Sequence, residues 1–284
     1  MSILWSFLGL LNGFFYKCFA TPEHLIPFLM ILAFIMFFSI GIFIENYSSL
    51  LTDLKRFTMK VTYYGHSCFS VYANGKHILF DPFITPNELA KEVDVDAIKA
   101  DYIFISHAHY DHILDVERIA KNTGAKVLGN FEIYNWLLKN GIENAHPINP
   151  GGKFDFDFGT VKCVVAQHPS SFIDGSYGGI ACGFVLTTSD GNFYYSGDTA
   201  LTLDMQLIPK FTKLDFAVFP IGDGLTMGIE EAIEASKLVG VNKILGVHYD
   251  TFGFIVMDHQ KALDAFKDAS LQLFLPKINS TINI

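Results

Sequence analysis

The sequence predicts an α/β protein of the α+β type, in which two β-sheets pack face to face and helices cover their outer faces. Three observations support this prediction. Short strands separated by turn residues open the region that begins at Met59, strand–helix units follow them, and the same succession returns in the second half of the chain. Strand hairpins mixed with strand–helix units bury their apolar faces well in such a layered arrangement.

The first half of this region is expected to begin with a hairpin meander and to continue with two strand–helix units. Asn74-Gly75 is a strong signal for a two-residue hairpin turn. Gly124 and Gly141 follow the expected helices, where glycine commonly ends a helix. The expected strands are 60–64, 68–73, 77–82, 102–107 and 126–130, and the expected helices are 111–122 and 131–140.

The second half repeats the pattern with a second group of strands. Asp190-Gly191 is expected to turn one strand of this group into the next. Apolar runs that alternate with amphipathic segments then favour strand–helix units. The expected strands are 154–158, 161–168, 180–188, 193–198, 216–222, 243–249 and 271–276, and the expected helices are 229–240 and 259–269.

Residues 1–58 form a separate N-terminal hydrophobic segment. Within it, residues 25–44 carry no charge, and about 20 apolar residues suffice for a helix to cross a bilayer. We therefore expect a transmembrane helix at 25–44. Lys55, Arg56 and Lys60 follow it, and the positive-inside rule places the domain at 59–284 in the cytoplasm.

A second interpretation of the N-terminal segment is equally open. Met59 begins a strand typical of a soluble domain, so the natural protein could start there and lack residues 1–58. The domain would then be soluble and cytoplasmic, and contact with a membrane is expected only if residues 1–58 are present. The four cysteines show no C-x-x-C spacing and no disulfide framework, which agrees with a reducing compartment.

The charge distribution excludes one class of partner. The formal charge of the chain is −9, and residues 1–58 contain equal numbers of acidic and basic residues, so the whole excess belongs to residues 59–284. An acidic domain without a basic stripe is poorly suited to phosphate backbones. We expect no nucleic-acid partner, and a homo-oligomer is left open.

A cluster of histidines interrupts this pattern directly after an apolar run. In "ISHAHYDHIL", His107, His109, Asp111 and His112 follow the expected strand at 102–107. Three imidazoles and a carboxylate that converge in a small volume are costly to desolvate without a compensating cation. Neutral imidazole together with carboxylate oxygen suits zinc, manganese or iron. The stretch therefore predicts metal ligands.

Three further strand ends supply polar side chains of the same kinds. "VVAQH" ends in His168, "FYYSGD" ends in Asp198 and "LGVH" ends in His248. Polar residues at the carboxyl ends of strands are where α/β architectures place their sites. Each has a structural alternative: the histidines could be hydrogen-bonded core residues, and Asp198 could cap a helix at 199–206. Taken together with the first cluster, they predict a metal site.

This set of residues resembles that of the metallo-β-lactamase-fold hydrolases, in which H-x-H-x-D-H is followed by a lone histidine, a lone aspartate and a last histidine. The resemblance covers residues 59–284 and implies an αββα sandwich. "YYGHSCF", "GDGLTMG" and "HYDTF" resemble the branch related to ascorbate-6-phosphate lactonase and to the phospholipase D that acts on N-acyl phosphatidylethanolamine. Leu114 stands where the family commonly has glycine, a departure that concerns packing beneath the site rather than the ligands.

The resemblance implies two divalent metal ions, with Zn²⁺ as the first choice and Mn²⁺ or Fe²⁺ as alternatives. Asp198 would bridge the two ions. One ion would take His107, His109 and His168, and the other would take Asp111, His112 and His248.

The reaction expected from such a pair is hydrolysis by a metal-activated hydroxide. Water bound to zinc can reach a pKa of about 7, against ~15.7 in bulk water. The substrate would be a small-molecule or lipid-like compound with an ester-like carbonyl (lactone, thioester or amide) or a phosphodiester. Two alternatives remain: a non-catalytic metal-binding scaffold of the same fold, and a membrane-lipid phosphodiesterase.

Residues around the ligands have expected roles as well. Asp111 could orient the nucleophile and carry its proton, and His66 could contact the substrate or be a plain turn histidine. Metal-bound histidines usually donate their other ring N–H to a carboxylate or carbonyl, and Asp81 is the candidate acceptor, with a turn-initiating Asp-Pro as the alternative. Asp223 and Thr226 lie in a glycine-bordered loop that could line the cleft.

Overall fold

The computed structural model describes residues 59–284, which belong to one compact unit of the chain. The transmembrane helix expected at 25–44 lies outside the described residues. Within 59–284, no helix has the length and apolar character needed to cross a membrane.

The first sheet has seven strands in the order β14-β1-β2-β3-β4-β5-β6. Strands β14, β1, β2 and β3 pair antiparallel, and β3 to β6 pair parallel. Asn74 and Gly75 both have positive φ between β2 and β3, as the expected hairpin turn requires. The strands are β1 (Lys60–Gly65), β2 (Cys68–Ala73), β3 (Lys76–Phe80), β4 (Tyr102–Phe104), β5 (Lys126–Gly129), β6 (Ala145–Pro147) and β14 (Ser280–Asn283).

The second sheet also has seven strands, in the order β13-β12-β11-β10-β9-β8-β7. Strands β7 to β10 pair antiparallel, and β10 to β13 pair parallel. The strands are β7 (Lys153–Phe156), β8 (Gly159–Val165), β9 (Cys182–Thr188), β10 (Gly191–Tyr195), β11 (Phe216–Pro220), β12 (Lys243–Val247) and β13 (Gln272–Phe274).

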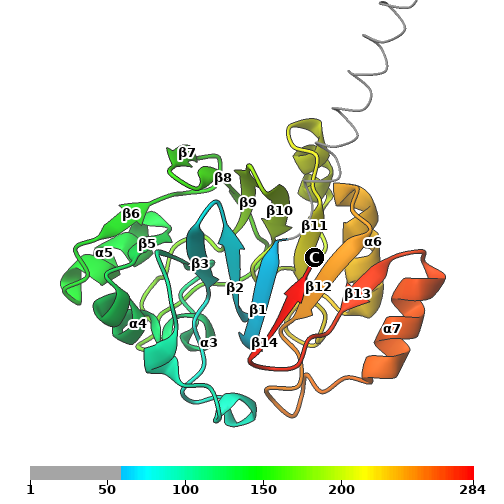
Figure 1. Ribbon diagram of the computed structural model, residues 1–284, viewed down its shortest axis with the longest axis horizontal. Helices are drawn as coiled ribbons and strands as arrows, with labels where there is room; N and C mark the ends of the chain where they lie inside the picture. The colour runs from blue at the N-terminus through cyan, green and yellow to red at the C-terminus, as the bar shows by residue number, and fades with distance from the viewer. Residues whose placement is uncertain (1–58) are drawn as a thin grey trace, which may run out of the picture. The chain divides into compact units, whose positions relative to one another are not determined.

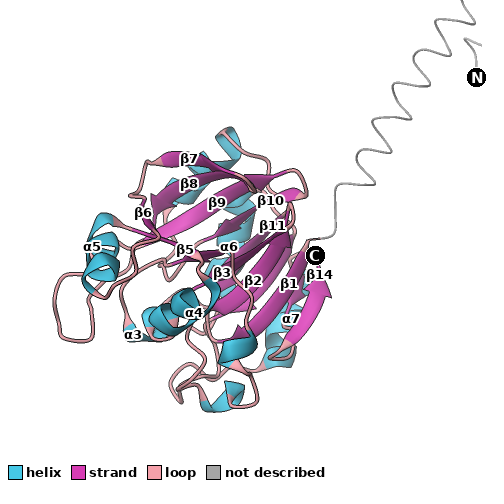
Figure 2. Cartoon of the chain, turned by 60° about the vertical axis from the view of Figure 1, so that its left-hand side comes forward, coloured by secondary structure: helices cyan, strands magenta, loops and turns pink. Residues whose placement is uncertain are grey.

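Helices lie on the outer faces of both sheets (Figures 1 and 2). The α-helices are α3 (Tyr110–Ile113), α4 (Val116–Thr123), α5 (Phe131–Lys139), α6 (Ile229–Val239) and α7 (His259–Asp268), and the 3-10 helices are η2 (Glu88–Ala90), η3 (Val95–Ala97) and η4 (Leu203–Lys210). Helices α4 and α5 flank the first sheet, and α6 and α7 flank the second. The expected αββα sandwich is therefore present.

Aromatic side chains fill the core between the two sheets. Phe80 of the first sheet packs against Phe193 of the second at 5.8 Å between ring centroids, and Phe104 packs against Phe184 at 5.0 Å. A smaller apolar cluster, which includes Ile103 and the residues of α4 and α5, lies on the other face of the first sheet. Burial on both faces explains why β4 is uniformly apolar in sequence.

Several expected elements differ from the structure at their ends, and two of them differ around residues 105–115. The strand expected at 102–107 ends at Phe104, because the carboxylate of Asp81 takes the N–H of Ser106 at 2.7 Å. The helix expected at 111–122 is divided into α3 and α4. It breaks at Asp115, whose N–H donates to the carbonyl of Pro82 at 3.1 Å.

Two short strands, β6 and β14, were not expected from the sequence. Strand β6 contains Pro147, which cannot donate to a sheet and is tolerated here at the edge. Strand β14 has only four residues, of which Ile282 alone is apolar, and pairs with β1 from the far end of the chain. Neither segment has the apolar run from which strands were identified.

Candidate metal centre

The seven residues predicted to bind metal meet at one end of the sandwich, where strands of both sheets end. His107, His109, Asp111 and His112 follow β4 in the first sheet. The second sheet contributes the other three from segments that follow three of its strands: His168 comes after β8, Asp198 after β10 and His248 after β12. The strand that precedes His168 was expected to end at that residue, but β8 ends at Val165. His168 therefore lies in the loop, three residues beyond the strand.

Three histidines form the first group of donors. The Nε2 of His107 lies 2.9 Å from the Nδ1 of His109. The ring of His168 is 5.0 Å from that of His107 and 5.1 Å from that of His109, between centroids. One donor atom from each ring lies within 4.8 Å of the other two. Ring nitrogens that converge in this way suit a shared cation.

The second group combines a carboxylate with histidines. One donor atom each from His66, Asp111, His112 and His248 lies within 4.8 Å of the others. The Oδ2 of Asp111 is 3.7 Å from the Nε2 of His112 and 3.9 Å from the Nε2 of His248. Within the described chain, the buried Nε2 of His112 forms no hydrogen bond, as expected of a nitrogen whose partner is an ion.

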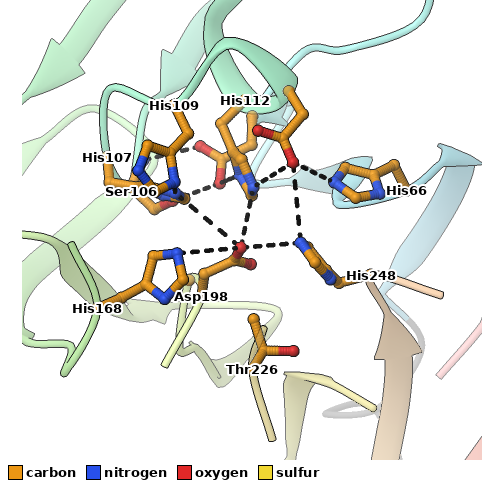
Figure 3. A network of polar contacts seen from close by, with 12 residues as sticks. His66, Ser106, His107, His109, His112, His168, Asp198, Thr226 and His248 are labelled. Atoms are coloured by element: carbon orange, nitrogen blue, oxygen red, sulfur yellow. Dashed lines mark hydrogen bonds and ion pairs between the residues drawn. The ribbon is translucent and has the colours of Figure 1, made fainter. Parts of the chain in front are cut away.

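Asp198 lies between the two groups (Figure 3). Its Oδ2 is 2.9 Å from the Nε2 of His248 and 3.2 Å from that of His112, on the side of the second group. Toward the first group it is 3.8 Å from the Nε2 of His168 and 4.0 Å from that of His107. The buried Oδ1 has no hydrogen-bond partner among residues 59–284. One carboxylate is thus placed to serve both groups.

Asp81 orients the histidines from behind. Its Oδ2 accepts hydrogen bonds from the Nδ1 of His112 at 2.8 Å, the hydroxyl of Ser106 at 2.5 Å and the hydroxyl of Tyr195 at 2.6 Å. Since the Ser106 hydroxyl donates to Asp81, it can accept the Nδ1–H of His107, which lies 2.9 Å away. Both imidazoles then direct Nε2 toward the cluster. The expected role of Asp81 as an acceptor for a cluster histidine is confirmed.

His66 is bound to Asp111 rather than being a plain turn histidine. Its Nε2 lies 3.0 Å from the Oδ2 of Asp111, and its Nδ1 lies 3.0 Å from the hydroxyl of Thr251. A neutral ring that donates Nε2–H to Asp111 leaves Nδ1 to accept from Thr251. In this tautomer the nitrogen of His66 that faces the cluster carries a proton and cannot bind a metal ion.

The backbone is strained at three of these positions. His66, Asp81 and His248 have φ values of 53°, 42° and 58°, a left-handed region that non-glycine residues seldom occupy. Such strain costs of order 1–3 kcal/mol per residue and is typical of functional sites. The N–H of His248 donates to the carbonyl of His66 at 3.0 Å, which ties two of the strained residues together.

Burial sets the charge of most of the histidines. It lowers the pKa of His107 well below the usual range and that of His168 to about 4. Burial and the neighbouring His248 lower the pKa of His66 to about 4. These rings are therefore neutral near pH 7, the form in which imidazole binds metal ions.

For Asp198 and His112, neighbouring opposite charges outweigh burial and favour the charged form. Burial opposes ionisation of Asp198, but His248 and His112 hold its pKa well below the usual range. Burial would likewise lower the pKa of His112, but Asp198, Asp111 and Asp81 outweigh it and raise that pKa well above the usual value. The site thus presents ionised carboxylates beside mostly neutral imidazoles, a donor set that fits Zn²⁺, Mn²⁺ or Fe²⁺.

Other expectations have mixed outcomes. Asp198 does not cap a helix at 199–206: the 3-10 helix η4 begins later and is capped by Thr202. Thr226 lies beside Asp198 and His248 (Figure 3).

The sequence did not indicate Ser106, Tyr195 and Thr251 as residues of the site, because hydroxyl residues are common and their partners lie far away in sequence. The position of Ser106 directly before His107 is the one signal that could have identified it.

Comparisons with known proteins agree with this geometry. Residues 76–249 match the family described as the beta-lactamase superfamily domain. A UPF0173 metal-dependent hydrolase from Christiangramia forsetii is 53% identical over 227 residues, which cover 80% of this chain and 100% of the relative. A second, from Flavobacterium johnsoniae, is 50% identical over 226 residues, again 80% of this chain and 100% of the relative.

A solved structure is similar as well. Igni18, a metallo hydrolase from the archaeon Ignicoccus hospitalis, is 32% identical with a TM-score of 0.73, over 80% of this chain and 98% of Igni18. The family match covers more than half of the chain, and the relatives are matched over their full length. The chain therefore belongs to the beta-lactamase superfamily, as a member of the UPF0173 metal-dependent hydrolases.

Proposed function

We propose that the protein hydrolyses an ester-like carbonyl compound or a phosphodiester with two divalent cations, of which Zn²⁺ is the first choice. His107, His109 and His168 would hold one cation, and Asp111, His112 and His248 would hold the other. The observation that carries the proposal is the position of Asp198, whose Oδ2 is within 4.0 Å of a histidine nitrogen from each group.

The chemistry divides between the cations and the chain. When bound, two cations supply a water molecule of lowered pKa and polarise the oxygen of the substrate. The water oxygen adds to the carbonyl carbon or phosphorus, the bond to the leaving atom breaks, and the leaving group takes up a proton. Asp111 would accept the proton of the water and pass it on.

The chain's other residues position these groups. The N–H of His66 holds Asp111 from one side at 3.0 Å, and Thr251 in turn holds His66. Asp81 fixes the ring of His112. No serine or cysteine nucleophile is needed in this scheme, so His66 and Asp111 are the catalytic residues that the proposal names.

The test combines metal analysis with activity. We expect about two equivalents of metal per chain in gently purified protein, measured by elemental analysis, and hydrolysis of at least one p-nitrophenyl ester or bis(p-nitrophenyl) phosphate. His109→Ala is expected to lose at least one equivalent and to reduce kcat/KM at least about a hundredfold, because metal-assisted formation of the nucleophile is lost. His77→Ala, on β3 and outside the cluster, is the matched control.

Two results would contradict the proposal. Turnover by His109→Ala equal to that of the parent would exclude the site as the centre of activity. A protein that carries its metal but hydrolyses nothing on the panel would instead favour the non-catalytic scaffold.

A further inference from the structure

The segments that carry the site residues contain no lysine or arginine side chain. Neither lysine nor arginine occurs in residues 105–115, 166–181, 196–202, 221–228 and 248–258. These segments do contain aspartates besides Asp111 and Asp198, namely Asp115, Asp174, Asp223, Asp250 and Asp258. Away from the metal ions, an anionic part of a substrate would therefore find no lysine or arginine on these segments to pair with it.

One lysine lies close to this region. Lys277, between β13 and β14, lines a hollow together with His66, Tyr249 and Thr251. His66 separates this hollow from Asp111, because its two ring nitrogens contact Thr251 on one side and Asp111 on the other. Lys277 thus lies behind His66 and not on the segments that surround the ligands.

Aromatic side chains continue from the metal cluster to the surface beside it. The aromatic wall consists of Phe83, Tyr110, Phe252 and Phe254. The ring of Phe252 is 5.4 Å from that of His66, 6.4 Å from Tyr110 and 5.6 Å from Phe254, between centroids. Phe83 packs edge-on against both His66 and Tyr110.

The wall includes both buried and exposed rings. Phe83 is buried, Phe252 is half-buried, and Tyr110 and Phe254 are 41% and 66% exposed. Tyr110 stands in the chain between His109 and Asp111, and Phe252 follows His248 by four residues. The apolar surface therefore begins next to the predicted metal ligands, where the bond to be hydrolysed would lie.

We propose that the substrate is an uncharged ester-like compound whose carbonyl carbon carries an apolar group that packs on the aromatic wall. This inference rests on the proposed hydrolase function and narrows it to one substrate class. Each methylene group that the wall removes from water should strengthen binding about fourfold. A negative charge at the same position would instead find no lysine or arginine on the site segments to pair with it.

The first test compares substrates that share one leaving group. We expect kcat/KM for p-nitrophenyl esters to rise about threefold to fourfold for each added methylene from acetate to hexanoate, as the chain covers the wall. The p-nitrophenyl hemi-ester of adipic acid has the same chain length as the hexanoate but ends in a carboxylate. We expect it and bis(p-nitrophenyl) phosphate to react at least tenfold more slowly than the hexanoate.

The second test changes the wall. Phe254→Ala is expected to reduce the ratio of kcat/KM for hexanoate to that for acetate several-fold. Phe254→Lys is expected to raise the ratio for the hemi-ester to that for hexanoate at least tenfold. The same replacements at Phe211 are the controls: Phe211 is 85% exposed and precedes β11, at the opposite end of that strand from residues 221–228. They should change neither ratio.

The outcomes separate the two proposals. Metal-dependent hydrolysis that favours the hemi-ester or the phosphodiester over hexanoate, or that is indifferent to chain length, would overturn the apolar substrate and leave the hydrolase standing. Substrate ratios that change equally at Phe254 and Phe211 would also overturn it. Metal-loaded protein that hydrolyses none of these compounds would remove both proposals.

Discussion

The Nδ1 of His112 lies 2.8 Å from the Oδ2 of Asp81, while the Nε2 of the same ring lies 3.2 Å from Asp198. Asp81 is fully buried and also accepts hydrogen bonds from the Ser106 backbone N–H, the Ser106 hydroxyl and the Tyr195 hydroxyl. A single carboxylate therefore fixes the orientation of a ring whose other nitrogen faces the candidate metal centre.

Replacing Asp81 by asparagine should weaken metal binding. Both oxygens of Asp81 accept hydrogen bonds, and asparagine keeps only one acceptor oxygen. Its amide nitrogen would face either the backbone N–H of Ser106 or the donors that include the Nδ1–H of His112, so the orientation of the His112 ring is less well fixed. Loss of such a partner typically costs about 10- to 100-fold in metal affinity. Titration with a competing chelator measures the change.

Asp115→Asn is the matched control for this experiment. Asp115 is also buried and accepts the backbone N–H groups of Ile84 and Thr85, but it does not contact the cluster. We expect both variants to unfold at lower temperature and only Asp81→Asn to lose metal affinity. Equal affinity losses would assign the effect to general destabilisation.

Removing metal should lower thermal stability. The site buries two carboxylates among histidines, and an ion that binds only the folded state stabilises it by about 4 kcal/mol at a thousand times its Kd. For a domain of this size each kcal/mol shifts the Tm by about 2–4 °C, so about 10 °C is expected overall. Scanning calorimetry with and without a chelator measures the shift. His109→Ala should show a smaller one, and an unchanged Tm in the parent would exclude a tightly bound ion.

Much of the site could be predicted because its donors follow apolar strands. His107–His112, Asp198 and His248 each come after a run that the sequence identifies as a strand, and parallel strands bring their carboxyl ends together. The contact between His66 and Asp111 could not be predicted, since 45 residues separate them and the turn that holds His66 depends on its positive φ.

The incorrectly predicted helix at 111–122 has the same cause, which is contact with residues far away in sequence. The break between α3 and α4 depends on Pro82, Ile84 and Thr85, which bind Asp115 from 30 or more residues away. Helical periodicity continues through that position in the sequence, so local pattern alone favours one unbroken helix. Leu114 lies at this junction, 46% exposed, and so does not pack beneath the site.

His66→Gln should slow turnover without removing metal. The N–H of His66 supports Asp111 at 3.0 Å, and loss of such an orienting group typically costs about 10- to 100-fold. We expect kcat to fall by this amount while elemental analysis still finds the parent's metal content. Thr251→Val removes the hydroxyl next to the Nδ1 of His66 and should lower kcat in the same direction by less. A loss of one metal equivalent in His66→Gln would instead make His66 a ligand.

Gly222→Ala should displace His248 through the backbone. A Cβ at position 222 would collide with the carbonyl oxygen of His248 and lie 3.2 Å from the Cβ of Ile255, both of which are buried. Overpacking of this kind costs about 1–3 kcal/mol of the free energy of unfolding, and the shift of His248 should also weaken metal binding. Gly253→Ala is the control, because its Cβ would have no neighbour within 4 Å. Denaturant unfolding and metal titration of both variants measure the two effects. If Gly222→Ala bound metal as tightly as Gly253→Ala, the packing at Gly222 would not position His248 for the cluster.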